Sequence, residues 1–508
     1  MLVLLSIILI RLATPVASQM YDYGFEVDHH LFQSHIQLRD TATPYVVGNI
    51  LHATNTTAVR QEIRKLEQDP DLWTLYMLGL NMMQYVDQNQ LLSYYQVAGS
   101  NDTLVALALN RNFESIQQRL YNLFSNYDSY GNFSNKAWIP PSDSGKYDSL
   151  ESLHDTIHSL AGLQGHMSWI PFSSFDPIFF LHHSMVDRAF ALWQILYPDS
   201  WIKPTAATSN SFTTSTGQIQ DSKTALTPFY SSTNGTFWTS DTVRDFGVFG
   251  YTYDDMVDFP RSSLTVANAT TQSQVKALIN QLYGKSSPAM LGVVGEEDEG
   301  VTERTMAQTT RRWTGPRQKE RMEHEVKNCT NVQTKPILPH SYDSPQSMPQ
   351  SLIADGHYRE WLVNIRTRKE ATGGAFLVHI FLGNVSTDTR SWAYAPNLVG
   401  TMGVFASPAS AMTGMDMKDS HAFGTVPLTL PLAQRVGSGE LASLEPEVVQ
   451  PYLGRNLKYA VATTGGEAVV PKDASELSIT VVSSVVQVPS KANELPRWGD
   501  IAVHFTLS

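Results

Sequence analysis

The spacing of apolar and polar residues divides the chain into a helical first part and a strand-rich last third. Apolar side chains recur every three or four residues through several long segments, as they do along one face of a helix. Segments rich in Gly, Ser, Thr and Asn separate them. Helices are expected at 58–96 (broken at Asp69–Pro70–Asp71), at 104–127 and at 266–283, and loops at 128–150 and 205–250.

From about residue 352 the pattern changes to short β-type runs. FLVHIFLG, LSITVVSSVVQV and IAVHFTL are rich in β-branched and aromatic residues and are separated by Gly, Pro and Ser. A smaller, β-rich second domain is therefore expected at 346–508. Before it, 289–345 carries GEEDEG, a basic run and a Pro-rich stretch, which is typical of a linker. An insertion or translated intron sequence fits this segment equally well.

Composition narrows the class of protein. A length of 508 residues suits two domains, and a net charge of −12 gives nucleic-acid binding no electrostatic basis. The only cysteine, Cys329, excludes an intrachain disulfide framework and a zinc site made of thiolates. No later apolar run is long enough to span a bilayer.

The first residues and the sequons bear on localisation. Residues 1–18 resemble a signal peptide, although Lys and Arg are missing from their start and Arg11 shortens the apolar run. Secretion is therefore expected, with a cytoplasmic location as the alternative. The Asn-x-Ser/Thr sequons permit glycosylation, at Asn55, Asn101, Asn132, Asn234, Asn268, Asn328 and Asn384.

Two helical patterns between 151 and 197 carry the candidate chemistry. His154 and His158 stand one turn apart, so both imidazoles reach one ion. Asp176–Pro177 is a good helix start, and His182–His183 follows it, so one of this pair can supply a third ligand. Three neutral histidines on two helices of a bundle fit copper that binds dioxygen, or a catalytic zinc.

With these residues in place, the chain resembles the tyrosinase family of type 3 copper proteins, and ascomycete fungal tyrosinases most closely. LESLHDTIH (150–158) and FDPIFFLHHSMVDRAFALWQ (175–194) carry the resemblance most specifically. YTY (251–253), SWAYAPNLVGTMGVFAS (391–407) and GELASLEPEVVQPYL (439–453) extend it. The resemblance implies a mainly α fold, with a helical-bundle type 3 copper core at 19–288 and a β-rich C-terminal lid domain at 346–508.

The resemblance also assigns roles to residues. It implies that His154, His158 and His183 bind the second of two coppers, CuB, and that His182 is a neighbour rather than a ligand. Among the expected catalytic residues, Phe179 packs against a ligand imidazole and Glu151 holds a water near the coppers. Asp155 follows the first ligand, where its identity leaves open whether monophenols are hydroxylated. The implied reactants are a phenolic small molecule and dioxygen, in the o-quinone chemistry of melanin-type pigments.

The chain departs from the family at the first copper site, CuA. In the family, a segment like YYQVAG (94–99) leads directly into the CuA histidines, but here SNDTLVALALNRNF follows Gly99. No histidine occurs between His52 and His154. CuA is therefore expected to be deleted between Gly99 and Ser100, leaving only the CuB ligands. Three hypotheses follow: a phenol-oxidising enzyme whose gene model lost an exon, a non-catalytic protein that binds one metal or a partner, and a dioxygen carrier.

Overall fold

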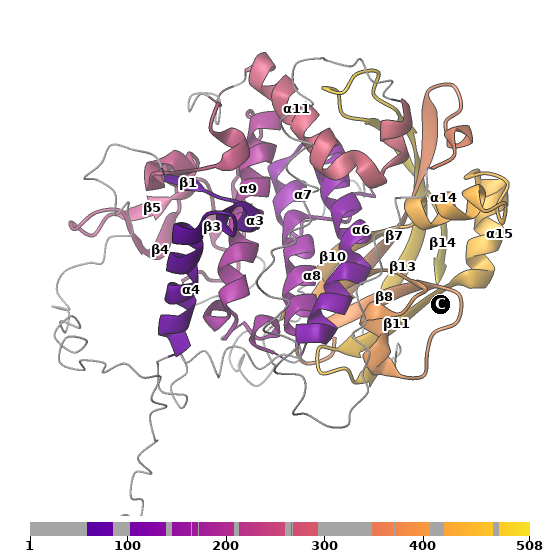
Figure 1. Cartoon of the computed structure of the whole chain (residues 1–508), viewed down its shortest axis with the longest axis horizontal. Coiled ribbons are helices and arrows are strands. Elements are labelled where there is room, and N and C mark those ends of the chain that lie inside the picture. Colours follow the sequence, from indigo (N-terminus) through magenta and orange to yellow (C-terminus); the bar gives the residue numbers. More distant parts are fainter. Residues whose placement is uncertain are drawn as a thin grey trace, which may run out of the picture.

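The computed structural model describes residues 58–84, 102–138, 145–163, 165–170, 172–207, 213–259, 266, 268–292, 348–369, 371–406, 421–470 and 477–507. It consists of a helical core followed by a β-rich C-terminal region packed against one side of it (Figure 1). The predicted fold class is thus confirmed. The expected signal peptide, most of the expected linker and the Gly99–Ser100 junction lie outside the described residues.

The helices of the core follow the apolar pattern. Ser149 caps α8 by accepting a hydrogen bond from the Ser152 amide. Asp176 caps α9 in the same way, with Pro177 in its first turn. The core helices are α3 (Ile63–Leu66), α4 (Pro70–Gln84), α6 (Asp102–Asn126), α7 (Tyr130–Ser134), α8 (Leu150–Gly162), α9 (Pro177–Leu196), α10 (Ser240–Val243) and α11 (Ala269–Tyr283).

Two expectations about the core were wrong in detail. Ala58–Arg60 is a short strand, β1, paired in parallel with β6 (Tyr251–Tyr253), and not the start of a helix. Long-range pairing overrides helix propensity there, because only the folded core brings Tyr251 next to Ala58. The expected loops also contain ordered elements: α7, α10, and the strands β2 (Thr205–Ala206), β3 (Ile219–Gln220), β4 (Ala225–Tyr230) and β5 (Phe237–Thr239).

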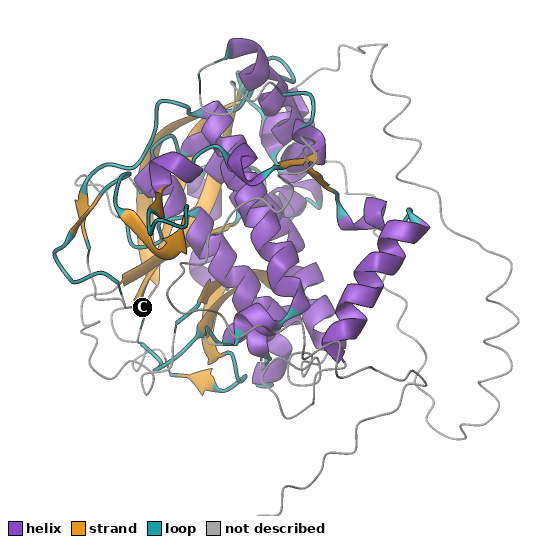
Figure 2. Ribbon diagram, turned by 90° about the vertical axis from the view of Figure 1, so that its left-hand side faces the viewer, coloured by secondary structure: helices purple, strands orange, loops and turns teal. Residues whose placement is uncertain are grey.

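The C-terminal region consists of two four-stranded sheets, ordered β10-β7-β13-β14 and β12-β11-β8-β9. Figure 2 shows most strands of the molecule gathered on one side of the helices. Apolar side chains of both sheets, such as Val363 and Val378, belong to one buried cluster. The helices α14 (Thr429–Gly437) and α15 (Pro446–Asn456) complete the region. The strands are β7 (His357–Arg368), β8 (Phe376–Leu382), β9 (Leu398–Val404), β10 (His421–Pro427), β11 (Leu457–Thr463), β12 (Ala468–Val469), β13 (Ser478–Gln487) and β14 (Arg497–Leu507).

Helix α8 lies directly against β9 and β10, and small residues make this approach possible. A Cβ added at Gly403 would lie 2.7 Å from the Thr156 Cα and 2.8 Å from the Asp155 carbonyl oxygen. A Cβ at Gly424 would lie 2.6 Å from the Ser152 hydroxyl oxygen. The helix that carries His154 and His158 is therefore seated on the C-terminal sheets. Within the described part of the chain, every helix is too short or too polar to cross a bilayer.

Candidate metal centre

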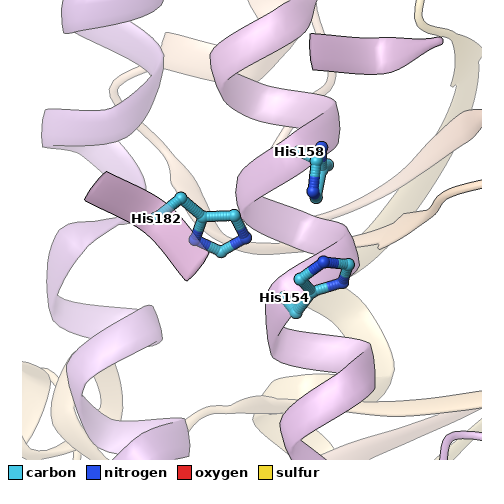
Figure 3. A group of neighbouring side chains, drawn as sticks. All are labelled: His154, His158 and His182. Carbon is cyan, nitrogen blue, oxygen red and sulfur yellow. The ribbon is translucent and has the colours of Figure 1, made fainter. Parts of the chain in front are cut away.

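Four histidines from α8 and α9 converge beside the C-terminal sheets. One ring nitrogen each of His154, His158 and His182 lies within 4.8 Å of the other two. Figure 3 shows His154 and His158 one above the other on one helix and the His182 ring reaching toward them from the neighbouring helix. His183 joins them, because its Nε2 lies 3.1 Å from the Nε2 of His154.

Three of these rings are oriented by oxygen atoms at Nδ1. The Nδ1 of His158 lies 2.8 Å from the Met167 carbonyl oxygen, and that of His183 lies 2.7 Å from the Phe179 carbonyl oxygen. The Nδ1 of His154 lies 3.0 Å from Asp155 Oδ1. An oxygen acceptor at Nδ1 holds the proton there and leaves the lone pair on Nε2, as metal-binding histidines require.

The remaining nitrogens fit a metal ion. The Nε2 atoms of His158 and His182 are buried and have no hydrogen-bond partner among the described residues. Burial, with a further contribution from His154, lowers the pKa of His158 to about 4. The same two causes, with burial the larger, hold the pKa of His182 well below its usual range. Both rings are therefore neutral at pH 7, so a cation bound beside them would meet uncharged imidazoles.

The structure thus brings together all three expected ligands, His154, His158 and His183, and adds His182. The sequence expectation treated His182 as a neighbour, whereas one of its ring nitrogens lies within 4.8 Å of a ring nitrogen of both His154 and His158. The Nδ1 contact with a helix carbonyl favours His183 as the third ligand, because that contact aims its Nε2 at His154.

Substitution of the paired histidines separates these two assignments. We expect His183→Ala to weaken Cu(I) binding by at least about 100-fold, because a directed ligand is lost, and His182→Ala to weaken it by less than about 10-fold. Anaerobic titration against a competing chromophoric Cu(I) chelator measures both. A larger loss for His182→Ala makes His182 the ligand.

Two phenylalanines enclose the histidines. The ring of Phe179, one turn before His183, has its centroid 3.8 Å from that of His183. The ring of Phe405 stacks on His158, with centroids 4.3 Å apart and planes inclined by 12°. Phe405 directly follows β9, so it belongs to the C-terminal region. The sequence did not single it out, because only the seating of β9 on α8 brings it to the histidines.

Glu151 and Asp155 both contact a lysine that sequence reasoning missed. The Lys136 amide donates to Glu151 Oε2 at 3.0 Å, and its ammonium group lies 3.5 Å from Glu151 Oε1. The same ammonium group donates to Asp155 Oδ2. Burial alone would raise the pKa of Asp155, but Lys136 and His154 outweigh it and lower that pKa below its usual value. Asp155 is therefore an anion that orients His154, while Glu151 is engaged by Lys136.

Asp187, one turn after His183, anchors α9 away from the histidines. Its carboxylate accepts hydrogen bonds from Tyr251 (2.7 Å) and Tyr253, and Arg60 lies 3.7 Å from it. Burial and the charge of Asp187 raise the pKa of both tyrosines. Asp187 therefore joins α9 to β6 and to Arg60 of β1.

Comparisons with known proteins agree with this geometry. Residues 47–196 match the common central domain of tyrosinase, and residues 360–481 match the tyrosinase C-terminal domain. A tyrosinase of Neurospora crassa is 31% identical over 444 residues, covering 78% of this chain and 64% of the relative. A tyrosinase of Podospora anserina is 31% identical over 358 residues, covering 68% of this chain and 60% of the relative. The chain thus spans less than two thirds of either relative.

A likeness of fold accompanies the likeness of sequence. The structure of recombinant mushroom tyrosinase superposes with a TM-score of 0.54 and 21% identity, over 80% of this chain and 65% of that one. At this identity the match speaks for the fold alone. The two matched domains coincide with the helical region that holds the histidines and with the strand-rich region that supplies Phe405.

Proposed function

Because this chain belongs to the tyrosinase family, we propose that the intact protein is a copper oxidoreductase of phenols, held closed by its C-terminal region, and that the 508-residue chain, with one of the family's two copper sites, is inactive. The observation that supports this proposal most directly is the orientation of three imidazoles. Each has an oxygen atom within hydrogen-bond distance of Nδ1, and each turns its Nε2 inward. Neutral histidines without thiolate or carboxylate ligands suit copper. The substrates that follow are a monophenol or an o-diphenol, and dioxygen.

The protein's own contribution is to orient the ligands and to exclude water. His154, His158 and His183 would hold the ion, and the copper would supply the redox chemistry that no side chain provides. Asp155 keeps the proton of His154 on Nδ1, and the carbonyls of Met167 and Phe179 do the same for the other two rings. Phe179 excludes water on one side of His183.

We assign Phe405 the role of a plug in the closed form. Its ring covers the imidazole of His158 at van der Waals distance, so a phenol ring cannot stack there while Phe405 remains. A C-terminal lid that must move before substrate enters is consistent with this contact. Its removal by a protease in the charged segment 289–345 is part of the proposal.

The absence of CuA also forms part of the proposal, and an exposed apolar surface supports it. Helix α9 turns Phe180 (57% exposed) to solvent, and α4 does the same with Leu75 (65% exposed). Further exposed apolar side chains of these helices are Ile178, Leu181, Met185, Leu72, Met77 and Leu78. Exposed large apolar side chains along two helices are typical of surfaces that another segment covers. A missing helical segment that carries the CuA histidines accounts for this surface.

The 508-residue chain is therefore expected to bind copper without oxidising diphenols at the rate of an intact relative. Two-electron oxidation of a diphenol requires two coppers that act together, and the described residues bring together one set of histidine ligands. We expect a stoichiometry of one Cu(I) per chain and negligible oxidation of L-DOPA, even after limited proteolysis of the lid. Metal analysis and quinone absorbance measure the two quantities, with His154→Ala as the control that loses the metal.

Sequencing the transcript across Gly99–Ser100 decides between the hypotheses. Additional in-frame sequence with three histidines identifies an enzyme with two coppers, and a chain that includes it should turn over diphenols. If the transcript encodes Ser100 directly after Gly99 and the protein binds one metal ion, the non-catalytic hypothesis is supported. Rapid oxidation of L-DOPA by the 508-residue chain itself would contradict the single-site proposal.

A further inference from the structure

Lys136 lies where the histidine helix, the C-terminal region and the segment after α7 meet. Its side chain is only 6% exposed, and its ammonium group has three oxygen neighbours from two parts of the chain. Two belong to α8: Asp155 Oδ2, to which it donates, and Glu151 Oε1 at 3.5 Å. The third is the Phe405 carbonyl oxygen, also at 3.5 Å.

The same residue holds the C-terminal region through its main chain. The Phe423 amide of β10 donates to the Lys136 carbonyl oxygen at 2.9 Å. Lys136 therefore contacts both strands that lie against α8: β10 through its backbone, and the end of β9 through its ammonium group. A buried ammonium group is costly unless several oxygens surround it, so its three oxygen neighbours favour one arrangement of these segments.

Asp155 continues the connection to the histidines. Its Oδ2 accepts one hydrogen bond from the Lys136 ammonium group and another, at 3.3 Å, from the Phe405 amide. Its Oδ1 lies 3.0 Å from His154 Nδ1. One buried carboxylate thus contacts the plug residue and a metal ligand, and Lys136 fixes its position. If Phe405 withdraws, Asp155 loses a donor and Lys136 loses an acceptor at the same time.

We propose that Lys136 is a positioning residue that couples the seating of Phe405 to the orientation of His154. This inference rests on the proposed function, since it takes the histidines as copper ligands. With the ammonium group in place, a single position of the Asp155 carboxylate serves both contacts: Oδ1 lies beside His154 Nδ1, and Oδ2 accepts the hydrogen bond of the Phe405 amide. Metal binding and closure of the C-terminal region therefore stabilise each other. Such a coupling is reciprocal: bound copper favours the closed form by the same factor by which closure raises the affinity for copper.

Amide hydrogen exchange at Phe405 in the full-length protein, with and without Cu(I), tests the coupling. In the unaltered chain we expect Cu(I) to slow this exchange by about 10-fold, within the usual range of coupling between two sites. Lys136→Met should speed exchange in the metal-free protein by at least about 10-fold and reduce the effect of Cu(I) to less than about 2-fold. Cu(I) affinity should fall by about 10-fold, the lower end for loss of an outer partner of a ligand.

The control is Lys146→Met, a lysine of the same segment whose ammonium group donates to the Asn126 carbonyl oxygen, away from the histidines. It should leave exchange at Phe405 and Cu(I) affinity unchanged. Should Lys136→Met fail to fold, the double variant Lys136→Met/Asp155→Asn removes both buried charges and is expected to fold, with the effect of Cu(I) on Phe405 still lost. The coupling is overturned if Cu(I) slows exchange in either variant as strongly as in the unaltered chain.

A failure of the proposed function looks different in the same experiment. If the unaltered chain binds no Cu(I), the assignment of the histidines as copper ligands is wrong. Amide exchange at Phe405 in the metal-free protein still shows whether Lys136 keeps Phe405 in place. Faster exchange at Phe405 in metal-free Lys136→Met, with Lys146→Met unchanged, supports that hold. Equal exchange in the two metal-free variants overturns it.

Discussion

Replacing Gly403 with alanine is expected to loosen the C-terminal sheets from helix α8 and to expose the histidine cluster. The added Cβ would lie 2.7 Å from the Thr156 Cα, 2.8 Å from the Asp155 carbonyl oxygen and 2.8 Å from the Ser159 hydroxyl oxygen. Two of these three atoms are backbone atoms of a helix, which cannot rotate away. The substitution therefore forces β9 and α8 apart, and Phe405 lies only two residues further along the chain.

Overpacking of this kind typically costs about 1–3 kcal/mol. Because the strain falls on the contact between the C-terminal region and α8, it favours the open form by about 5- to 150-fold. Two hydrogen bonds weaken at the same time: Gly403 N–H to the Thr156 hydroxyl at 3.0 Å, and the Arg119 guanidinium to the Thr401 carbonyl oxygen at 3.4 Å. We expect a chelator to remove copper from Gly403→Ala at least about 10-fold faster than from the unaltered protein.

Gly374→Ala is the matched control, because an added Cβ there has no atom within 4 Å. It introduces the same methyl group into the C-terminal region, in the turn between β7 and β8, and should leave the rate of copper removal unchanged. Equal rates for Gly403→Ala and the unaltered protein would show that the C-terminal region does not limit access to the histidines.

The local parts of the candidate site were readable from the sequence. The His154–His158 spacing, the Asp176–Pro177 helix start and the His182–His183 pair are features of single helices, and helix geometry fixes where their side chains point. The division into a helical core and a strand-rich C-terminal region followed from the apolar periodicity in the same way. Both predictions depend on contacts between residues close in the chain.

The parts that the sequence did not show depend on contacts between distant segments. Phe405 lies on His158 because β9 packs against α8. This packing joins distant parts of the chain: Gly403 and Thr156, which share a hydrogen bond, are 247 residues apart in the sequence. Lys136 lies in a segment expected to be an ordinary loop, and nothing in its neighbourhood marks it as buried. Pairing between distant segments also made Ala58–Arg60 a strand. Periodicity carries no information about such pairings, since each arises only when the elements pack.

The second large effect is expected from pH, through Glu360 of β7. This residue is fully buried, and neither of its carboxylate oxygens has a hydrogen bond within 3.5 Å among the described residues. Burial raises its pKa to about 7, although Thr429, Tyr358 and Asn122 are close enough to oppose the rise. The titratable groups that face it are Tyr121 of α6 and Tyr358 of β7; burial, and to a lesser extent the charge of Glu360, raises the pKa of each. Glu360 thus lies between the helical core and the C-terminal sheets.

The direction of the effect follows from the two pKa values of Glu360, about 7 in the folded protein and 4.5 as the ordinary value. Between them the folded protein binds more protons than the unfolded chain, so the free energy of unfolding falls as pH rises. The contribution is fully present below about pH 4.5 and is lost as pH rises through about 7. The difference of about 2.5 pKa units corresponds to roughly 3 kcal/mol.

Denaturant unfolding between pH 5 and 8 should therefore show a decline in stability that Glu360→Gln removes, because glutamine is neutral throughout. The variant should be the more stable protein at pH 8 and should lose its advantage toward pH 5. Glu467→Gln, at an exposed position in the turn before β12, is the control and should follow the unaltered chain at every pH. If the free energy of unfolding of Glu360→Gln and of the unaltered chain changed with pH in parallel, the titrating group would be a residue other than Glu360. Since Glu360 faces α6, its ionisation above about pH 7 weakens the contact between β7 of the C-terminal region and α6 of the helical core.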